Sequence, residues 1–91
     1  MKNVVCFKLI SGDEVVGDLV QESSDHFVMS KPFIVIAGQQ GIGLIPVMIT
    51  ARPDDNITFY YNSLATKPQP VVGDFERHYT EKTSGIQLLS W

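Results

Sequence analysis

The chain has 91 residues, 44% of them hydrophobic, and a formal net charge of −3 at pH 7. This length gives one domain without room for two independent cores, and the hydrophobic content excludes a disordered chain. The acidic balance excludes nucleic-acid binding through a broad basic surface, so such a contact needs a local patch. No signal peptide or apolar run of membrane-spanning length is visible, and the single cysteine cannot form an internal disulfide. We therefore expect a cytoplasmic protein that does not contact a membrane.

Residues 4–21 carry the pattern of a β-hairpin. Apolar residues alternate with other residues along 4–10 and again along 14–21, and a polar turn separates the two runs. Gly12 stands where this turn needs a positive φ, which a side chain would resist. Gly17 lies inside the second strand, where glycine is favoured only if the strand bends sharply or another backbone comes close. The hairpin therefore predicts a small, strongly curved barrel.

Three further strands are expected at 26–37, 44–51 and 57–62. Pro32 indicates a bulge, a kink or an edge in the first of them, because proline lacks the N–H of a ladder. The glycine-rich segment 38–43 could cradle a phosphate, but no Lys-Ser/Thr pair and no helix follow it, so we interpret it as a flexible turn. Five short strands without an amphipathic helix among them predict an all-β fold.

The tail at 63–91 has a different character from the domain at 1–62. Asp74 and Gly85 stand where they could begin and end a short helix of one or two turns. The aromatic residues of the tail, which include Trp91, indicate that it docks on its own domain or on a neighbour. We therefore expect a tail that is partly extended and partly helical. The residues at helical spacing are Phe75, His78, Tyr79 and Lys82.

The first hairpin resembles the first motif of the Sm-like family, which comprises the Sm, LSm and Hfq proteins. The family's second motif, Ile-Arg-Gly at the turn between the last two strands, is matched in part by Ala51-Arg52-Pro53 and the following Asn56-Ile57. Proline replaces the glycine there, and the family's N-terminal helix has no counterpart. We interpret these departures as those of an outlying branch of phage or marine-microbial origin. The first motif is matched by Phe7, Leu9, Gly12, Val15, Gly17 and Leu19.

The resemblance implies an all-β fold, a small and strongly bent five-stranded open barrel with an extended C-terminal tail. It also implies a homo-oligomeric ring of about five to seven subunits, in which the edge strands of neighbours pair. The residues allow this independently, because long apolar edges left bare would aggregate. The expected interface residues alternate along two strands: Ile45, Val47, Ile49, Ile57, Phe59 and Tyr61.

The resemblance further implies that single-stranded RNA binds at the inner turns of the ring. We expect His26 to stack on a base and Asp25 to accept a base N–H. Arg52 would contact a base or a phosphate, and Asn56 would bond to a base edge. Alternatively, His26 simply begins a strand and Arg52 pairs with an aspartate of its own turn. The family's asparagine is missing from the loop before His26, although a ring would repeat each weak contact several times.

Metal binding and acid–base catalysis have little support in the sequence. His26 and His78 are far apart, and neither has a cysteine or carboxylate at ligand spacing. The adjacent acids at 13–14 and 54–55 lie in predicted turns, where solvated carboxylates are the usual case. We therefore expect no enzyme activity, no cofactor and no metal. The alternative function is a ring-shaped protein-interaction or assembly module that uses its tail as the contact and binds no RNA.

Overall fold

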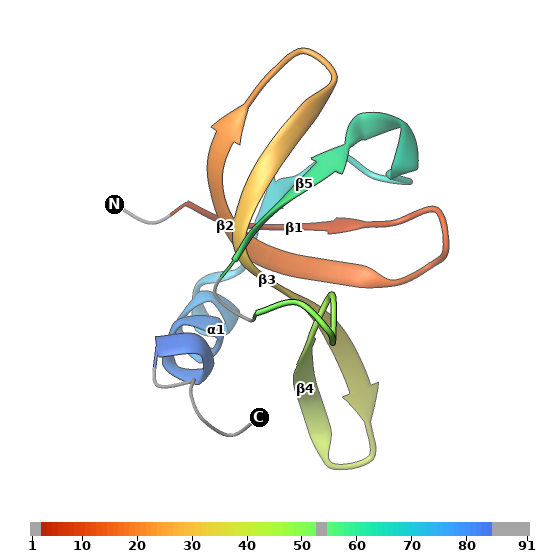
Figure 1. Cartoon of the computed structure of the whole chain (residues 1–91). Coiled ribbons are helices and arrows are strands. Elements are labelled where there is room, and N and C mark those ends of the chain that lie inside the picture. The colour runs from red at the N-terminus through yellow and green to blue at the C-terminus, as the bar shows by residue number, and fades with distance from the viewer. Residues whose placement is uncertain (1–2, 53–54, 85–91) are drawn as a thin grey trace.

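The computed structural model describes residues 3–52 and 55–84. They form an open antiparallel sheet of six strands and one C-terminal α-helix (Figure 1). The strands lie in the order β4-β3-β2-β1-β6, and β5 pairs with β3 as well. The elements are β1 (Val4–Lys8), β2 (Glu14–Glu22), β3 (His26–Gly38), β4 (Gly41–Pro46), β5 (Asn56–Tyr60), the 3-10 turn η1 (Tyr61–Ser63), β6 (Gln69–Pro70) and α1 (Gly73–Ser84).

The predicted hairpin of β1 and β2 is confirmed, and so are the two roles assigned to its glycines. Gly12 has a φ of 101°, and its N–H donates to the Leu9 carbonyl at 2.9 Å. A Cβ at Gly17 would lie 2.7 Å from Met29 Cε and 3.1 Å from Pro32 Cα. The Met29 side chain could move aside for a Cβ, but the Pro32 backbone would have to shift, so the absence of a side chain at position 17 lets β2 and β3 approach closely here.

β3 bends where it faces this glycine. In the β2–β3 ladder, Gly17 alone lies opposite the two residues Lys31 and Pro32. Lys31 adopts a φ of 51°, in the left-handed region, so the irregularity expected at Pro32 is a β-bulge. The extra residue turns the second half of β3 over. Phe27 therefore packs on one face of the sheet and Phe33 on the other.

The two halves of β3 have different partners on the edge away from β2. The first half pairs with β5, from Ser30 opposite Asn56 to His26 opposite Tyr60, and the second half pairs with β4. The strand expected at 44–51 is therefore shorter and begins earlier, because the glycine-rich segment closes a hairpin with β3. Its turn is at Gln39–Gln40, and Gly41 follows with a φ of 112°, a conformation suited to glycine.

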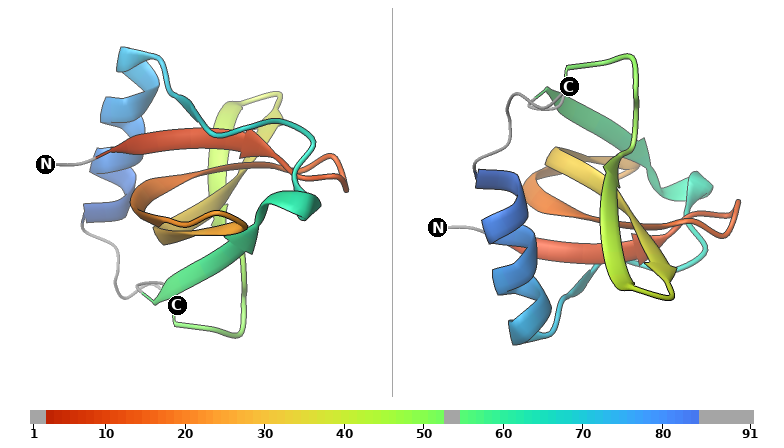
Figure 2. Two further views of the ribbon diagram at one scale, coloured as in Figure 1. Left: turned by 90° about the horizontal axis from the view of Figure 1, so that it is seen from above. Right: turned by 90° about the horizontal axis from the view of Figure 1, so that it is seen from below.

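Apolar side chains pack on both faces of the sheet. The inner cluster is enclosed by the bent sheet itself, and the outer cluster lies between the sheet and α1. Figure 2 shows α1 running across the sheet beside the N-terminal end of β1 in both views. The buried members of the inner cluster are Val5, Phe7, Val15, Phe27, Met29 and Phe59. Those of the outer cluster are Val4, Val16, Phe33 and Tyr79.

The segment expected to be a tail is part of this domain, which corrects the five-stranded expectation. Gln69 and Pro70 form a sixth strand on the free edge of β1, and α1 runs over 12 residues instead of one or two turns. Tyr79 on its inner face is buried, whereas Lys82, expected on the same face, is exposed. The expected helix end at Gly85 lies outside the described residues. Within those residues, no helix has the length and apolar character needed to cross a membrane.

Tyr79 joins the helix to the bulge. Its side chain is 1% exposed, and its hydroxyl donates to the Lys31 carbonyl at 2.7 Å. Lys31 has no partner in the ladders of β3, so this hydroxyl supplies a bond that the bulge itself does not provide. Burial, and to a lesser extent the nearby charge of Asp18, raises the pKa of Tyr79 far above its ordinary value. The residue therefore stays neutral and keeps its proton for the carbonyl.

Candidate nucleic-acid interface

Two turns meet at the end of the sheet where β3 begins. Loop 23–25 joins β2 to β3, and η1 follows β5. The Tyr61 N–H donates to the Asp25 carbonyl at 3.1 Å, which ties η1 to the loop. Within η1, the Ser63 hydroxyl donates to the Tyr60 carbonyl at 2.7 Å. We refer to loop 23–25, His26, Tyr60 and η1 together as the aromatic end.

His26 and Tyr60 present two partly exposed rings side by side at the aromatic end. They are a cross-strand pair of β3 and β5, with ring centroids 5.8 Å apart. Tyr60 is 54% exposed and the His26 side chain 33%. The Asp25 carboxylate lies 2.6 Å from His26 Nδ1 and fixes the orientation of the imidazole. The two ring planes are tilted by 53°, so each ring presents its own partly exposed surface on which a planar ligand can stack.

The inner cluster supports these two rings from below. Phe27 and Phe59 stack at 5.7 Å between centroids, and Tyr61 contacts Phe27 at 5.1 Å. Because Phe27 is fully buried and Phe59 nearly so, the backbone that carries His26 and Tyr60 rests on a packed aromatic core. The two exposed rings are therefore held on rigid strands and not on a flexible loop.

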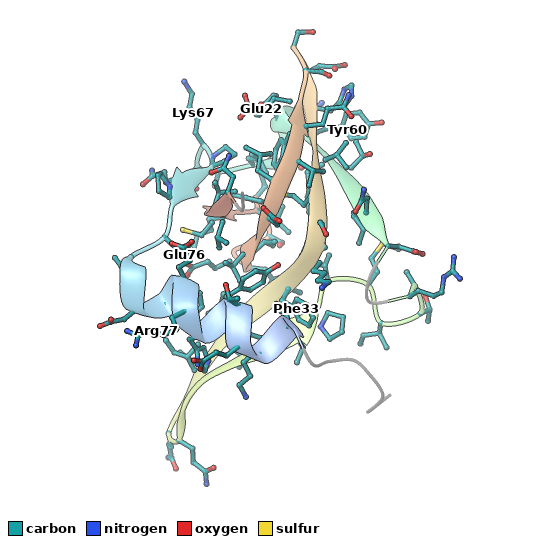
Figure 3. All side chains as sticks on the ribbon, turned by 90° about the vertical axis from the view of Figure 1, so that its left-hand side faces the viewer. Glu22, Phe33, Tyr60, Lys67, Glu76 and Arg77 are labelled. Atoms are coloured by element: carbon teal, nitrogen blue, oxygen red, sulfur yellow. The ribbon has the colours of Figure 1, made fainter. Side chains whose placement is uncertain are left out.

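A groove of about 530 Å³ runs beside Tyr61 along the segment that leaves η1. One carboxylate and one ammonium group line it, from Glu22 and Lys67, which lie toward the same end of the molecule as Tyr60 in Figure 3. The other lining residues are Tyr61, Leu64, Ala65, Thr66 and Pro68. Neither His26 nor Tyr60 lines the groove. A groove of this size with one cation has room for one or two nucleotides but provides little phosphate neutralisation.

Of the four predicted RNA-binding residues, the structure brings two together and leaves two elsewhere. Asp25 and His26 are adjacent at the aromatic end, whereas Asn56 begins β5 at its opposite end, about 13 Å away along the strand at 3.3 Å per residue. Arg52 lies on the connection before β5, and its Nε is 3.5 Å from an Asp55 carboxylate oxygen. That pairing is the alternative left open by the sequence. His26 is the first residue of β3, as the alternative interpretation of the sequence predicted.

The predicted interface residues divide into two groups. The side chains of Phe59, Ile57, Tyr61 and Val47 pack in or against the inner cluster of their own chain, so they are committed to the fold. Ile45 and Ile49 are exposed, at 39% and 81%. The prediction chose these residues because they alternate along a strand. Core-facing residues and interface residues show the same alternation, so the pattern cannot distinguish them.

Two other titratable side chains, those of Cys6 and His78, are partly buried and lie outside the aromatic end. Cys6 is partly buried in β1, and burial and then the charge of Glu14 raise the pKa of its thiol, which disfavours the reactive thiolate. His78 has a buried Nε2 without a hydrogen-bond partner and packs against Phe75. In the part of the chain described, no three His, Cys, Asp or Glu residues group together as metal ligands would.

Sequence reasoning did not assign Tyr60 or the residues of η1 to the RNA-binding site, and it assigned Tyr61 to the subunit interface. The match to the second family motif falls on the connection before β5, whereas the turn between the last two strands is η1 and the segment after it. A signal was available, because two successive aromatics, Tyr60 and Tyr61, cannot both face inward in a strand of period two. Asn62 follows them and is exposed.

We compared the chain with known proteins. No family model matches the sequence, and no curated protein matches it. The resemblance to the Sm-like family therefore stays a prediction from the residues of the first hairpin and of the partial second motif.

Proposed function

We propose that this chain is a ring-forming Sm-like protein that binds single-stranded RNA at the aromatic end. The observation that carries the proposal is the pair of exposed rings of His26 and Tyr60, held on paired strands over a packed core. Single-stranded RNA is recognised by stacking its bases on such rings and by hydrogen bonds to base edges. The Asp25 carboxylate lies 2.6 Å from the His26 ring, and the exposed Asn62 belongs to η1; both would supply such bonds.

Ring formation is supported by the free strand edges. Among the described residues, β5 pairs only with β3 and β6 pairs only with β1, so each leaves one edge open. If β6 of one subunit pairs with β5 of the next, the contact is head-to-tail and closes into a ring. Light scattering coupled to gel filtration should give the mass of a ring of about five to seven subunits, or a multiple of that mass where rings associate. A monomer at micromolar concentration would contradict the ring.

RNA binding is tested by fluorescence anisotropy with short U-rich and A-rich oligonucleotides. Stacking on an aromatic ring is worth about 1–3 kcal/mol per base, so His26→Ala and Tyr60→Ala should each weaken binding about fivefold or more. Tyr60→Phe keeps the ring and should bind within about twofold of the parent. Arg52→Ala is a charge control away from the aromatic end, and we expect it to bind like the parent. Absence of binding by an intact oligomer would refute the proposal.

The salt dependence gives an independent test of how the RNA is held. With a net charge of −3 and Lys67 as the cation in the groove, few counterions are released on binding. For an oligonucleotide short enough to occupy one subunit, one neutralised phosphate predicts a loss of about threefold between 50 and 200 mM salt. A loss of a hundredfold or more would mean that a basic surface, and not stacking, dominates the binding.

A further inference from the structure

The hairpin of β3 and β4 extends beyond both clusters and exposes apolar side chains. Ile36 is 45% exposed, Ile42 49% and Ile45 39%. The sequence contains no charged residue between Lys31 and Arg52, so the hairpin lacks the lysines that commonly protect an edge strand from other strands. Figure 1 shows this hairpin projecting from the lower part of the sheet, with β4 on its outer edge.

The hydrogen-bonding direction of β4 follows from one bond at its end. The Val47 N–H donates to the Pro32 carbonyl, so residue 47 points toward β3. Successive residues of a strand alternate in direction, and Gly43 and Ile45 therefore also point their backbone groups toward β3. Ile42 and Leu44 point theirs outward. Pro46 falls in the outward set, where the missing N–H costs no ladder bond.

We infer that β4 pairs antiparallel with β4 of a second copy of this chain, about a two-fold axis at Gly43. In this register, Ile42 of each copy lies opposite Leu44 of the other, and the outward groups of these residues form four backbone hydrogen bonds. The exposed Ile42 side chain is then covered by Leu44 from the facing strand. This surface is separate from the strand edges and the aromatic end used in the proposed function.

The glycine at the axis favours a second copy over another occupant. Gly43 faces its own equivalent in a non-hydrogen-bonded pair, where the Cα atoms of facing strands approach to about 4.5 Å. No atom lies within 4 Å of a Cβ built at this position, so the space on that face is open. An uncharged strand also meets its own copy without repulsion, whereas a charged partner would find no complement here.

Disulfide cross-linking tests the register in the full chain. In Gly43→Cys, the two thiols meet at the axis within the Cα spacing that a disulfide needs. In the control Ile45→Cys, each cysteine lies opposite Gly41 of the other copy, and the two thiols are about 13 Å apart. After mild oxidation, Gly43→Cys should run as a dimer on a denaturing, non-reducing gel, and Ile45→Cys and the parent with Cys6 should not. Equal cross-linking of the two variants, or no cross-linking of Gly43→Cys, would overturn the inference.

A charge on the edge provides the second measurement. Ile42→Lys should halve the mass measured by light scattering, whether the parent is a dimer or a pair of rings, and should keep the melting temperature of the fold. Ile10→Lys introduces the same charge at a 69% exposed position on the β1–β2 turn and should leave the mass unchanged. An unchanged mass for Ile42→Lys would count against pairing of β4 with a second copy. The free edge of β4 would then be covered by another segment of the same chain. Loss of RNA binding or of the ring leaves the cross-linking result unaffected, because neither includes Gly43.

Discussion

Replacing Tyr79 by phenylalanine removes one hydroxyl and tests how the helix supports the bend of the sheet. The hydroxyl donates to the Lys31 carbonyl at 2.7 Å and approaches the Ser30 carbonyl at 3.3 Å. Tyr79 is 1% exposed, so no bulk water takes the place of the lost donor. The ring remains in the outer cluster, and the substitution therefore isolates the hydrogen bond from the packing.

The expected magnitude follows from leaving the part-buried Lys31 carbonyl without its Tyr79 donor. Such a loss costs about 1–3 kcal/mol of unfolding free energy, more than the net worth of an average hydrogen bond. For a domain of this size, each kcal/mol lowers the melting temperature by about 4–8 °C. Tyr79→Phe should therefore melt at least about 4 °C below the parent.

Urea unfolding followed by circular dichroism, together with thermal melts, measures this difference. Tyr60→Phe is the matched control, because it removes the hydroxyl of a 54% exposed tyrosine and should change stability by less than about 0.5 kcal/mol. If Tyr79→Phe unfolds at the parent's urea concentration, the bulge does not depend on this bond and the role given to the helix is wrong.

Three further predictions follow from described contacts. Because the pKa of Tyr79 is raised in the fold, its contribution to stability is complete below the unfolded value of about 10 and is lost as the pH rises above it, so urea midpoints of the parent and Tyr79→Phe should approach each other progressively as the pH is raised above 10. Gly17→Ala places a methyl group against Met29 and the Pro32 backbone and should lower the free energy of unfolding by about 1–3 kcal/mol in urea. An unchanged urea midpoint would show that β2 and β3 can move apart at this position without cost. Because burial raises the pKa of the Cys6 thiol, it should react with a disulfide reagent more slowly than free cysteine at pH 8 and should reach the rate of free cysteine in urea. A fast reaction in the native state would contradict the partly buried position of Cys6 in β1.

The first hairpin could be predicted because its signals are local. Alternation, a turn glycine and a glycine within a strand are all readable over fifteen residues or so, and each has one physical meaning. The length of α1 could not be predicted this way, because its stability comes from Tyr79 packing on Val16 and Phe33, far away in the sequence. β6 likewise exists only because the edge of β1 is there to receive Gln69 and Pro70.

The candidate site was predicted in part for a similar reason. His26 and Asp25 were found because a polar turn precedes a strong strand. The end of β5 at Tyr60, in contrast, depends on the bond between Tyr61 and Asp25, which a linear pattern does not contain. A chain cut at Asn62, the boundary suggested by the sequence, would expose the outer cluster and would not test what the tail does.

The position of α1 has a consequence for synthesis of the protein. During translation, the β1–β2 hairpin and β3 leave the ribosome well before the helix, and the outer face with Val4, Val16 and Phe33 has no cover until residue 79 follows. The nascent sheet therefore exposes apolar surface of the kind that chaperones bind. The hydroxyl of Tyr79, arriving last, completes the hydrogen bonding of a bend made 48 residues earlier.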